Sequence, residues 1–257
     1  MIPYKIFPMY ILGPLHISMY GVMFAIAFSI ATFLAVREAR KRGIDKEIVY
    51  DLVVYLLVGG IIGARIFYVL FYWPENMPLH FFDAFKIWQG GLAYFGGFLG
   101  ALVAGYVYIQ KHKLNFWLYA DICTIPLVIG HMFGRLGGYF TGLHPGRVTD
   151  MPWSIYLQGE FRHPVVLYEI IGLIIIAVLL IHLKKLKYFH GFLFSSYVVL
   201  YAIQRIILDF FRIESTDPRH WSLTPTQHLV ILLFVLAVWF IGWNVRKTKI
   251  QVYFFNV

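Results

Sequence analysis

Charged residues and cysteine are both scarce in this chain. Of its 257 residues, 14% are charged and 60% are hydrophobic, and the mean hydropathy is +0.71. A soluble domain of this length cannot bury so much apolar surface, so the composition excludes the soluble globular class and indicates a polytopic membrane protein. The single cysteine, Cys123, excludes an intrachain disulfide and is best explained by packing within an apolar segment.

Metal, nucleotide and hydrolase motifs are also missing from the sequence. The ten histidines are scattered and show no HxxxH or Cys/His spacing of the kind that binds metal ions. Neither a phosphate-binding P-loop nor a nucleophile elbow occurs. We therefore predict neither a metal nor a cofactor.

Seven apolar stretches reach or approach the roughly 20 residues that are needed to cross a bilayer. The sequence therefore predicts an all-α fold, a single transmembrane bundle of seven helices over residues 1–257. The expected spans are Ser18–Val36, Ile48–Trp73, Gly90–Ile109, Trp117–Gly134, Pro164–Leu183, Gly191–Phe211 and Gln227–Asn244. The fourth span is the weakest, because it is short and contains Asp121, Pro126 and His131.

The distribution of basic residues predicts the orientation of these spans. Thirteen of the 22 lysines and arginines lie in the connections after the first, third and fifth spans and in the carboxyl-terminal tail. Because cytoplasmic segments of membrane proteins carry an excess of Lys and Arg, we expect the amino terminus outside and the carboxyl terminus in the cytoplasm. The net charge of +9 is then a topology signal, and we expect no nucleic-acid partner.

Four arginines lie within or at the ends of apolar stretches: Arg65, Arg135, Arg205 and Arg212. With this orientation and a rise of about 1.5 Å per residue, all four are expected in the outer half of the membrane or at its surface. A charge in hydrocarbon costs at least about 2.5–3.5 kcal/mol, so such residues usually serve a function. We interpret the four guanidinium groups as a receptor for an anionic ligand, under a small outer cap formed by roughly residues 135–163.

The segment from Arg205 to Arg212 has the most specific local pattern. In a helix, Arg205, Asp209 and Arg212 lie at i, i+4 and i+7, so they share one face. One carboxylate neutralises one guanidinium, which leaves about one positive charge for a ligand. The alternative is an interfacial cluster that anchors the helix end, although Arg212 alone would serve that purpose.

Glycines are dense around Arg135 and at the start of the third span, in Gly130–Gly138 and Gly90–Gly100. Such residues allow a backbone to approach a ligand closely, and free amides beside a guanidinium help to bind phosphate oxygens. They equally allow two membrane helices to pack closely. Both interpretations remain open for these segments.

Other polar residues within the spans have a structural and a functional interpretation. Arg65 is expected to pair with Asp121 or Asp209, or to extend the anion site. We interpret Glu169 as a structural partner of one of the arginines rather than as a general base. His131 is interpreted as a hydrogen-bonding residue between helices rather than as a catalyst.

At these residues the chain resembles the prolipoprotein diacylglyceryl transferases. The resemblance extends over nearly the whole length, and although each motif is modest by itself, their order within seven spans is specific. The motifs are Met19–Gly21, Gly63–Arg65, Trp88–Gly91, Gly134–Gly137, Gly146–Arg147, Arg162–Pro164, Leu167–Glu169, Arg205–Arg212 and Gln227.

The resemblance implies an enzyme of the bacterial cytoplasmic membrane that moves a diacylglyceryl group from phosphatidylglycerol to a cysteine thiol in the lipobox of a prolipoprotein. Glycerol phosphate is released, and the partners are phosphatidylglycerol, the prolipoprotein signal peptide and membrane lipids. By the family's pattern Arg135 holds the lipid phosphate, Arg205 stabilises charge on the leaving phosphate, and Tyr20 lines the site. The substrate-binding residues expected from it are Arg135, Arg65, Arg212, Asp209, Gly96, Gly97, Gly146 and Glu169.

The chain departs from the family pattern at three positions. Phe95 stands where a histidine typically precedes two glycines, Gly138 where an asparagine is usual, and Leu143 where an acidic residue is usual. That histidine is the natural candidate for the base that deprotonates the thiol, and phenylalanine cannot replace it. Either an electropositive pocket lowers the thiol pKa from about 8.5 so that no base is needed, or His144 takes the role, or the chain binds an anionic lipid without this chemistry. Because the arginine framework is complete, we expect transferase activity.

Overall fold

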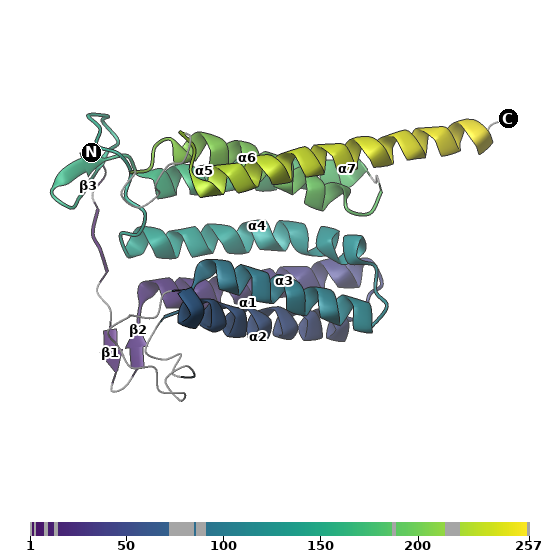
Figure 1. Cartoon of the computed structure of the whole chain (residues 1–257), viewed down its shortest axis with the longest axis horizontal. Coiled ribbons are helices and arrows are strands. Elements are labelled where there is room, and N and C mark those ends of the chain that lie inside the picture. Colours follow the sequence, from purple (N-terminus) through teal and green to yellow (C-terminus); the bar gives the residue numbers. More distant parts are fainter. Residues whose placement is uncertain are drawn as a thin grey trace. The chain divides into compact units, whose positions relative to one another are not determined.

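The computed structural model of the chain is largely helical (Figure 1). It describes residues 2, 4–7, 10–12, 15–71, 85, 91–186, 189–213 and 222–255, without the side chains of residues 10–12, 15–17, 94, 95, 225 and 248–255. Trp88, Gln89 and Gly90, which belong to one of the motifs above, lie outside the described residues, as does the side chain of Phe95.

Seven α-helices run through the described residues, as the apolar pattern predicts. Their bounds are α1 Met19–Lys41, α2 Lys46–Phe71, α3 Tyr94–Lys111, α4 Phe116–Phe140, α5 Val165–Leu183, α6 Phe192–Asp209 and α7 Pro225–Phe255. Six of the described helices are long and apolar enough to cross a bilayer, and α3 is not among these six. Its 18 residues include four glycines and end in Gln110 and Lys111, which lowers its hydropathy. The helical class is confirmed, and the count of seven spans stays a prediction.

Helix α4 continues beyond the apolar stretch from which it was predicted. It runs past Gly134 to Phe140, with Pro126 inside it. The change from apolar to more polar side chains ends the hydrophobic span without ending the backbone hydrogen bonding. As a result Arg135 lies inside α4, five residues before its end, and the connection to α5 begins only after Phe140.

In the described ranges, four strands of three residues each form two small hairpins. Strand β1 (Tyr10–Leu12) pairs antiparallel with β2 (Leu15–Ile17), and β3 (Ile155–Leu157) pairs antiparallel with β4 (Glu160–Arg162). The second hairpin turns at Gln158 and Gly159, with φ of 56° and 83°. Positive φ at both central residues fits the two-residue turn whose twist matches paired strands. This hairpin lies in the connection between α4 and α5, within the segment predicted to form a cap.

The chain divides into two compact units. One comprises residues 1–8, 18–31 and 120–257, and the other comprises residues 9–17 and 32–119. In the first unit α6 packs against both α5 and α7 (Figure 1). Its apolar core includes Val128 of α4, Leu173 and Leu180 of α5, and Leu193 of α6. The organisation as a single bundle stays a prediction.

In the second unit α2 and α3 pack together almost backbone to backbone. A Cβ at Gly63 would lie 2.4 Å from the carbonyl oxygen of Gly96, and one at Gly100 would lie 2.2 Å from that of Gly59. Since non-bonded atoms cannot approach so closely, only glycine fits these positions. Helix packing therefore accounts for glycine at position 96, and a role of Gly96 and Gly97 in substrate binding stays a prediction.

Candidate active site

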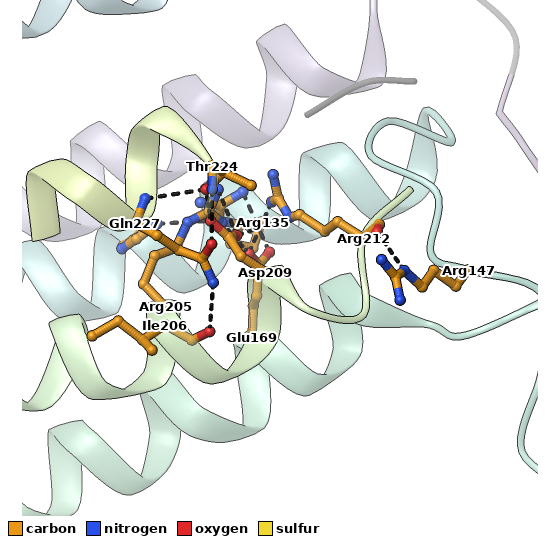
Figure 2. Close-up of polar contacts among 10 residues, drawn as sticks. Arg135, Arg147, Glu169, Arg205, Ile206, Asp209, Arg212, Thr224 and Gln227 are labelled. Carbon is orange, nitrogen blue, oxygen red and sulfur yellow. Dashed lines mark hydrogen bonds and ion pairs between the residues drawn. The ribbon is translucent and has the colours of Figure 1, made fainter. Parts of the chain in front are cut away.

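Glu169 is the centre of a buried ionic cluster in the first unit (Figure 2). Its Oε1 accepts hydrogen bonds from Nη1 of Arg205 at 2.8 Å and from Nη2 of Arg212 at 3.0 Å. Nη1 of Arg135 lies 3.3 Å from its other oxygen, Oε2. One carboxylate of α5 thus pairs with an arginine of α4, an arginine of α6 and an arginine just after α6. The sequence predicted the structural partnership, but with a single arginine.

The predicted helix face of Arg205, Asp209 and Arg212 is present. Oδ1 of Asp209 lies 3.0 Å from Nη2 of Arg205 and 3.6 Å from Nε of Arg212. Helix α6 ends at Asp209, and the turn that follows keeps Arg212 on the same side. All three residues are buried.

The start of α7 adds neutral hydrogen-bonding groups to the cluster. Oγ1 of Thr224 donates to Oδ2 of Asp209 at 2.9 Å and accepts from the backbone N–H of Gln227 at 3.1 Å. In return, Oε1 of Gln227 accepts from the backbone N–H of Thr224 at 2.8 Å. This reciprocal pair is a capping box with Pro225 at the first helical position. The Thr-Pro-Thr-Gln signature is visible in the sequence, yet nothing in it indicates that Thr224 also contacts Asp209.

Arg135 is the most accessible of the three clustered arginines. Its side chain is 20% exposed, against 7% for Arg205 and 3% for Arg212. Its Nε donates to Nε2 of His131, one turn earlier, at 3.2 Å, so that imidazole nitrogen carries no proton. His131 therefore orients the Arg135 guanidinium. It is hydrogen-bonded as expected, but within α4 rather than between helices.

A narrow crevice lies beside the cluster. It is lined by His131, Arg135, Glu169, Leu173, Tyr201, Gln204, Arg205 and Leu208, from α4, α5 and α6. A water-sized sphere does not fit into this crevice. A group as large as a phosphate can therefore enter it only if side chains move.

Gln204 belongs to this crevice although the sequence did not single it out. Its Nε2 donates to the backbone carbonyl of Glu169 at 2.8 Å, and its buried Oε1 has no hydrogen-bond partner among the described residues. Gly172 makes this position available, because a Cβ there would lie 2.6 Å from Cδ of Gln204. A buried acceptor without a partner costs about 1–3 kcal/mol. Its Oε1 is therefore an acceptor that a bound ligand can satisfy.

The connection between α4 and α5 is hydrogen-bonded to the backbone at Arg212. Gly146 forms an antiparallel bridge with Arg212, and Nε of Arg147 donates to the Arg212 carbonyl at 3.2 Å (Figure 2). A Cβ at Gly146 would lie 2.2 Å from the carbonyl oxygen of His163, so only glycine fits there. Gly146 and Arg147 thus fix the path of the chain that carries Arg212.

A short chain of hydrogen bonds lies at the start of α5. Nε1 of Trp153 donates to the Tyr168 hydroxyl at 2.6 Å, and this hydroxyl lies 3.2 Å from Nδ1 of His163. The Tyr168 hydroxyl therefore connects the indole of Trp153 to the imidazole of His163. Burial lowers the pKa of His163 below its ordinary value, since it disfavours the charged imidazolium. His163 is thus held as the neutral imidazole.

Arg65 lies in the second unit and is buried. Its Nη1 donates to the carbonyl oxygen of Gly91 at 3.0 Å, and its guanidinium carbon lies 5.4 Å from the centre of the Tyr68 ring. This guanidinium therefore ties α2 to the segment just before α3. Its expected pairing with Asp121 or Asp209 would join the two units and stays a prediction.

Two other residues singled out from the sequence lie in the first unit. Tyr20 approaches α4 closely, because a Cβ at Gly137 would lie 3.2 Å from the Cα of Tyr20 and 3.3 Å from its Cδ2. Gly137 is two residues after Arg135 in the same helix. His144 is exposed in the connection after α4 and has a φ of 58°. Neither observation tests the roles expected for Tyr20 and His144.

Among the described residues, the cluster combines the guanidinium groups of three arginines with the carboxylates of Glu169 and Asp209. Guanidinium groups bind phosphate oxygens through paired N–H donors. The converging arginines therefore offer the kind of donor that a phosphodiester accepts.

Comparison with known proteins identifies relatives of the whole chain. Residues 8–243 match the family model described as prolipoprotein diacylglyceryl transferase. A protein of Aliarcobacter butzleri is 37% identical over 93% of this chain and 92% of its own length. A protein of Geobacillus kaustophilus is 35% identical over 93% and 91%, and one of Listeria monocytogenes is 32% identical over 88% and 85%. All three are named phosphatidylglycerol–prolipoprotein diacylglyceryl transferase.

Proposed function

The chain belongs to the prolipoprotein diacylglyceryl transferase family, and on this premise we propose that it transfers the diacylglyceryl group of phosphatidylglycerol to a prolipoprotein. It is a transferase and a multi-pass membrane protein, with six described helices capable of spanning a bilayer. The acceptor in this proposal is the cysteine thiol of the lipobox in the prolipoprotein signal peptide.

One observation carries the assignment of the site: three arginines converge on Glu169 in a buried cluster. Guanidinium groups bind phosphate oxygens through paired N–H donors. The phosphate of phosphatidylglycerol supplies such oxygens. Arg135, the most accessible of the three arginines, is the group that meets it first.

The reaction forms one bond and breaks another. The thiolate sulfur attacks the glycerol carbon that carries the phosphate ester, so an S–C bond forms as the C–O bond breaks. The electron pair of the C–O bond remains on the departing glycerol phosphate, and the thiol proton balances the charge that is released. We propose that Arg135 holds the phosphate, while Arg205, fixed between Glu169 and Asp209, stabilises the charge that develops on it.

The other site residues have supporting roles in this proposal. Tyr20 is proposed to line the site, and Arg65 is proposed to bind substrate. Glu169 and Asp209 act by fixing the arginines rather than by transferring protons. The remaining residues proposed to shape the substrate-binding site are Arg212, Gly96, Gly97 and Gly146.

Thiol activation has two proposed routes, since Phe95 cannot act as a base. In the first, the positive charge of the arginine cluster lowers the pKa of the substrate thiol and thiolate forms without a dedicated base. In the second, His144 accepts the thiol proton from the exposed connection after α4. Substitution of His144 by Gln separates these routes, because only the second requires an imidazole.

The basic residues support an orientation with the amino terminus outside and the carboxyl terminus in the cytoplasm, across seven spans. In that orientation the end of α6, the start of α5 and the end of α4 all face the outer side of the bacterial cytoplasmic membrane. The arginine cluster then lies on the side where exported prolipoproteins emerge.

Purified protein, phosphatidylglycerol labelled in its acyl chains and a lipobox peptide test the proposed reaction. We expect the peptide to gain the mass of one diacylglyceryl group and an equal amount of glycerol phosphate to appear. A peptide with serine in place of the cysteine should gain no such mass. Binding of phosphatidylglycerol without transfer would contradict the proposal and favour the second candidate, an anionic-phospholipid-binding protein, which Phe95 suggests.

A further inference from the structure

A second charged concavity lies in the second unit, apart in sequence from the arginine cluster. It is a groove of about 530 Å³ lined by Phe33, Val36, Arg37, Arg40 and Lys41 of α1 and by Tyr50 of α2. This volume lies within the range of ordinary ligand pockets, about 300–1,000 Å³. The groove combines an aromatic and apolar part with three cations.

Helical periodicity places the lining residues of α1 in one stripe. Phe33, Val36, Arg37, Arg40 and Lys41 are related by i, i+3, i+4, i+7 and i+8, so all five project from one face. At about 1.5 Å per residue the stripe runs some 12 Å along the helix. Its apolar end belongs to the part of α1 that can span a bilayer, and its cationic end coincides with the end of the helix.

Among the described residues, the cations of this groove have no acidic partner, although acidic residues are close in sequence. Glu38 pairs with Arg42 at 3.1 Å, and Glu47 contacts Lys46 at 3.7 Å. The acidic side chains are therefore directed to basic residues that do not line the groove. Within the part of the chain that the structure describes, Arg37, Arg40 and Lys41 form no ion pair.

We propose that this groove binds one anionic phospholipid of the bilayer, with its phosphate at Arg37, Arg40 and Lys41 and an acyl chain along Phe33 and Val36. A soluble anion would use only the cationic end and would leave the exposed Phe33 without a partner. A lipid uses both ends, because its phosphate and its chains are arranged along the same axis as the stripe. Clusters of Lys and Arg next to a membrane helix bind anionic head groups by this attraction.

The test is titration of the full-length protein in detergent micelles with phosphatidic acid, monitored by native mass spectrometry. Phosphatidic acid is chosen because it is anionic and diacylated but has no glycerol head group to transfer. The groove variant is R37Q/R40Q/K41Q, and the matched control is K111Q/K113Q/K185Q, which removes the same charge from residues that do not line the groove. Phosphatidylcholine and soluble glycerol phosphate are titrated in parallel.

We expect the groove variant to bind one phosphatidic acid about 100-fold more weakly than the native chain, at roughly fivefold for each of the three cations lost. The control variant should change by less than about threefold, since its charges are outside the groove. Both the native chain and the variants should bind phosphatidylcholine only weakly.

Three results would overturn the proposal. Equal weakening in the groove and control variants would mean a general effect of net charge, and unchanged binding in the groove variant would mean that the lipid binds elsewhere. Glycerol phosphate that binds the native chain as tightly as phosphatidic acid would mean a site for soluble anions. Diacylglyceryl transfer is measured on the same samples, and we expect the groove variant to retain it. Lipid binding by the groove and diacylglyceryl transfer are therefore tested separately.

Discussion

Arg205 and Arg212 donate to one and the same atom, Oε1 of Glu169, at 2.8 Å and 3.0 Å. Two guanidinium groups this close repel each other unless an anion lies between them. Glu169 supplies that anion, and Asp209 supplies a second one on the other side of Arg205. The five charges therefore depend on one another, and removal of any one of them is expected to disturb the rest.

Glu169→Gln keeps the shape of this side chain and removes its charge. Three buried or partly buried arginines then lose the carboxylate on which they converge, and we expect the free energy of unfolding to fall by about 3–5 kcal/mol. The thermal midpoint in detergent measures this loss. Glu160→Gln is the control, because Glu160 pairs with Arg162 at an exposed position. Equal midpoints for the two variants would show that Glu169 does not hold the cluster together.

Arg205→Lys keeps the positive charge and removes the planar pair of N–H donor groups, Nη1 and Nη2. Arg205 reaches Glu169 through Nη1 and Asp209 through Nη2, and a single ammonium cannot reproduce this planar arrangement. We expect the rate of transfer to fall about 100-fold or more, the usual cost of one misplaced charge-stabilising donor. Arg42→Lys, in the ion pair with Glu38, should leave the rate unchanged. Full activity of Arg205→Lys would mean that transfer does not depend on the paired donors of the guanidinium group.

Thr224→Ala tests the link between α7 and the cluster. The variant loses the helix cap and the hydrogen bond to Oδ2 of Asp209. We expect a loss of about 1–2 kcal/mol in the free energy of unfolding, and slower transfer because Asp209 then orients Arg205 less well. Thr226→Ala, in the same first turn but not at the cap, is the comparison. Equal free energies of unfolding for Thr224→Ala and Thr226→Ala would mean that the cap of α7 does not stabilise the protein.

The pH dependence of stability follows from His163. Its folded pKa is lower than its ordinary value, because burial disfavours the charged form. Well above pH 7 the group is neutral in both states and contributes nothing. Below about pH 6.5 the unfolded chain takes up the proton first, so stability falls as the pH falls towards the folded pKa. The thermal midpoint of His163→Gln should therefore decrease less than that of the native chain between pH 7.5 and pH 5.

The same substitution at His190, an exposed residue, should leave the pH dependence of the native chain in place. The role assigned to His163 would be contradicted if the thermal midpoints of the native chain and of His163→Gln changed equally with pH over this range.

The sequence predicted what depends on local spacing. The seven helices follow from apolar runs, and the face shared by Arg205, Asp209 and Arg212 follows from i+3 and i+4 neighbours. The convergence of the arginines on Glu169 does not follow from local spacing. Glu169 is 36 positions away from Arg205, and their contact forms only when α5 packs against α6. Gln204 was missed for the same reason.

Glycine-rich segments show a different limit of sequence interpretation. Gly96 and Gly63 fit both a ligand-binding loop and a close helix crossing, since both need a residue without a side chain. The structure shows the close crossing of α2 and α3 at these positions. Gly146 likewise has a packing reason, its contact with the His163 carbonyl, that no local motif reveals.

The most direct test of the central claim is the rate of diacylglyceryl transfer from phosphatidylglycerol to a lipobox-cysteine peptide, measured for the native chain beside Arg135→Ala and Arg205→Ala. We predict transfer by the native chain, with Phe95 in place, and loss of transfer in both variants although phosphatidylglycerol and peptide are saturating. Transfer that survives both substitutions would contradict the assignment of the Glu169 cluster as the active site. Absence of transfer by the native chain would contradict the function itself.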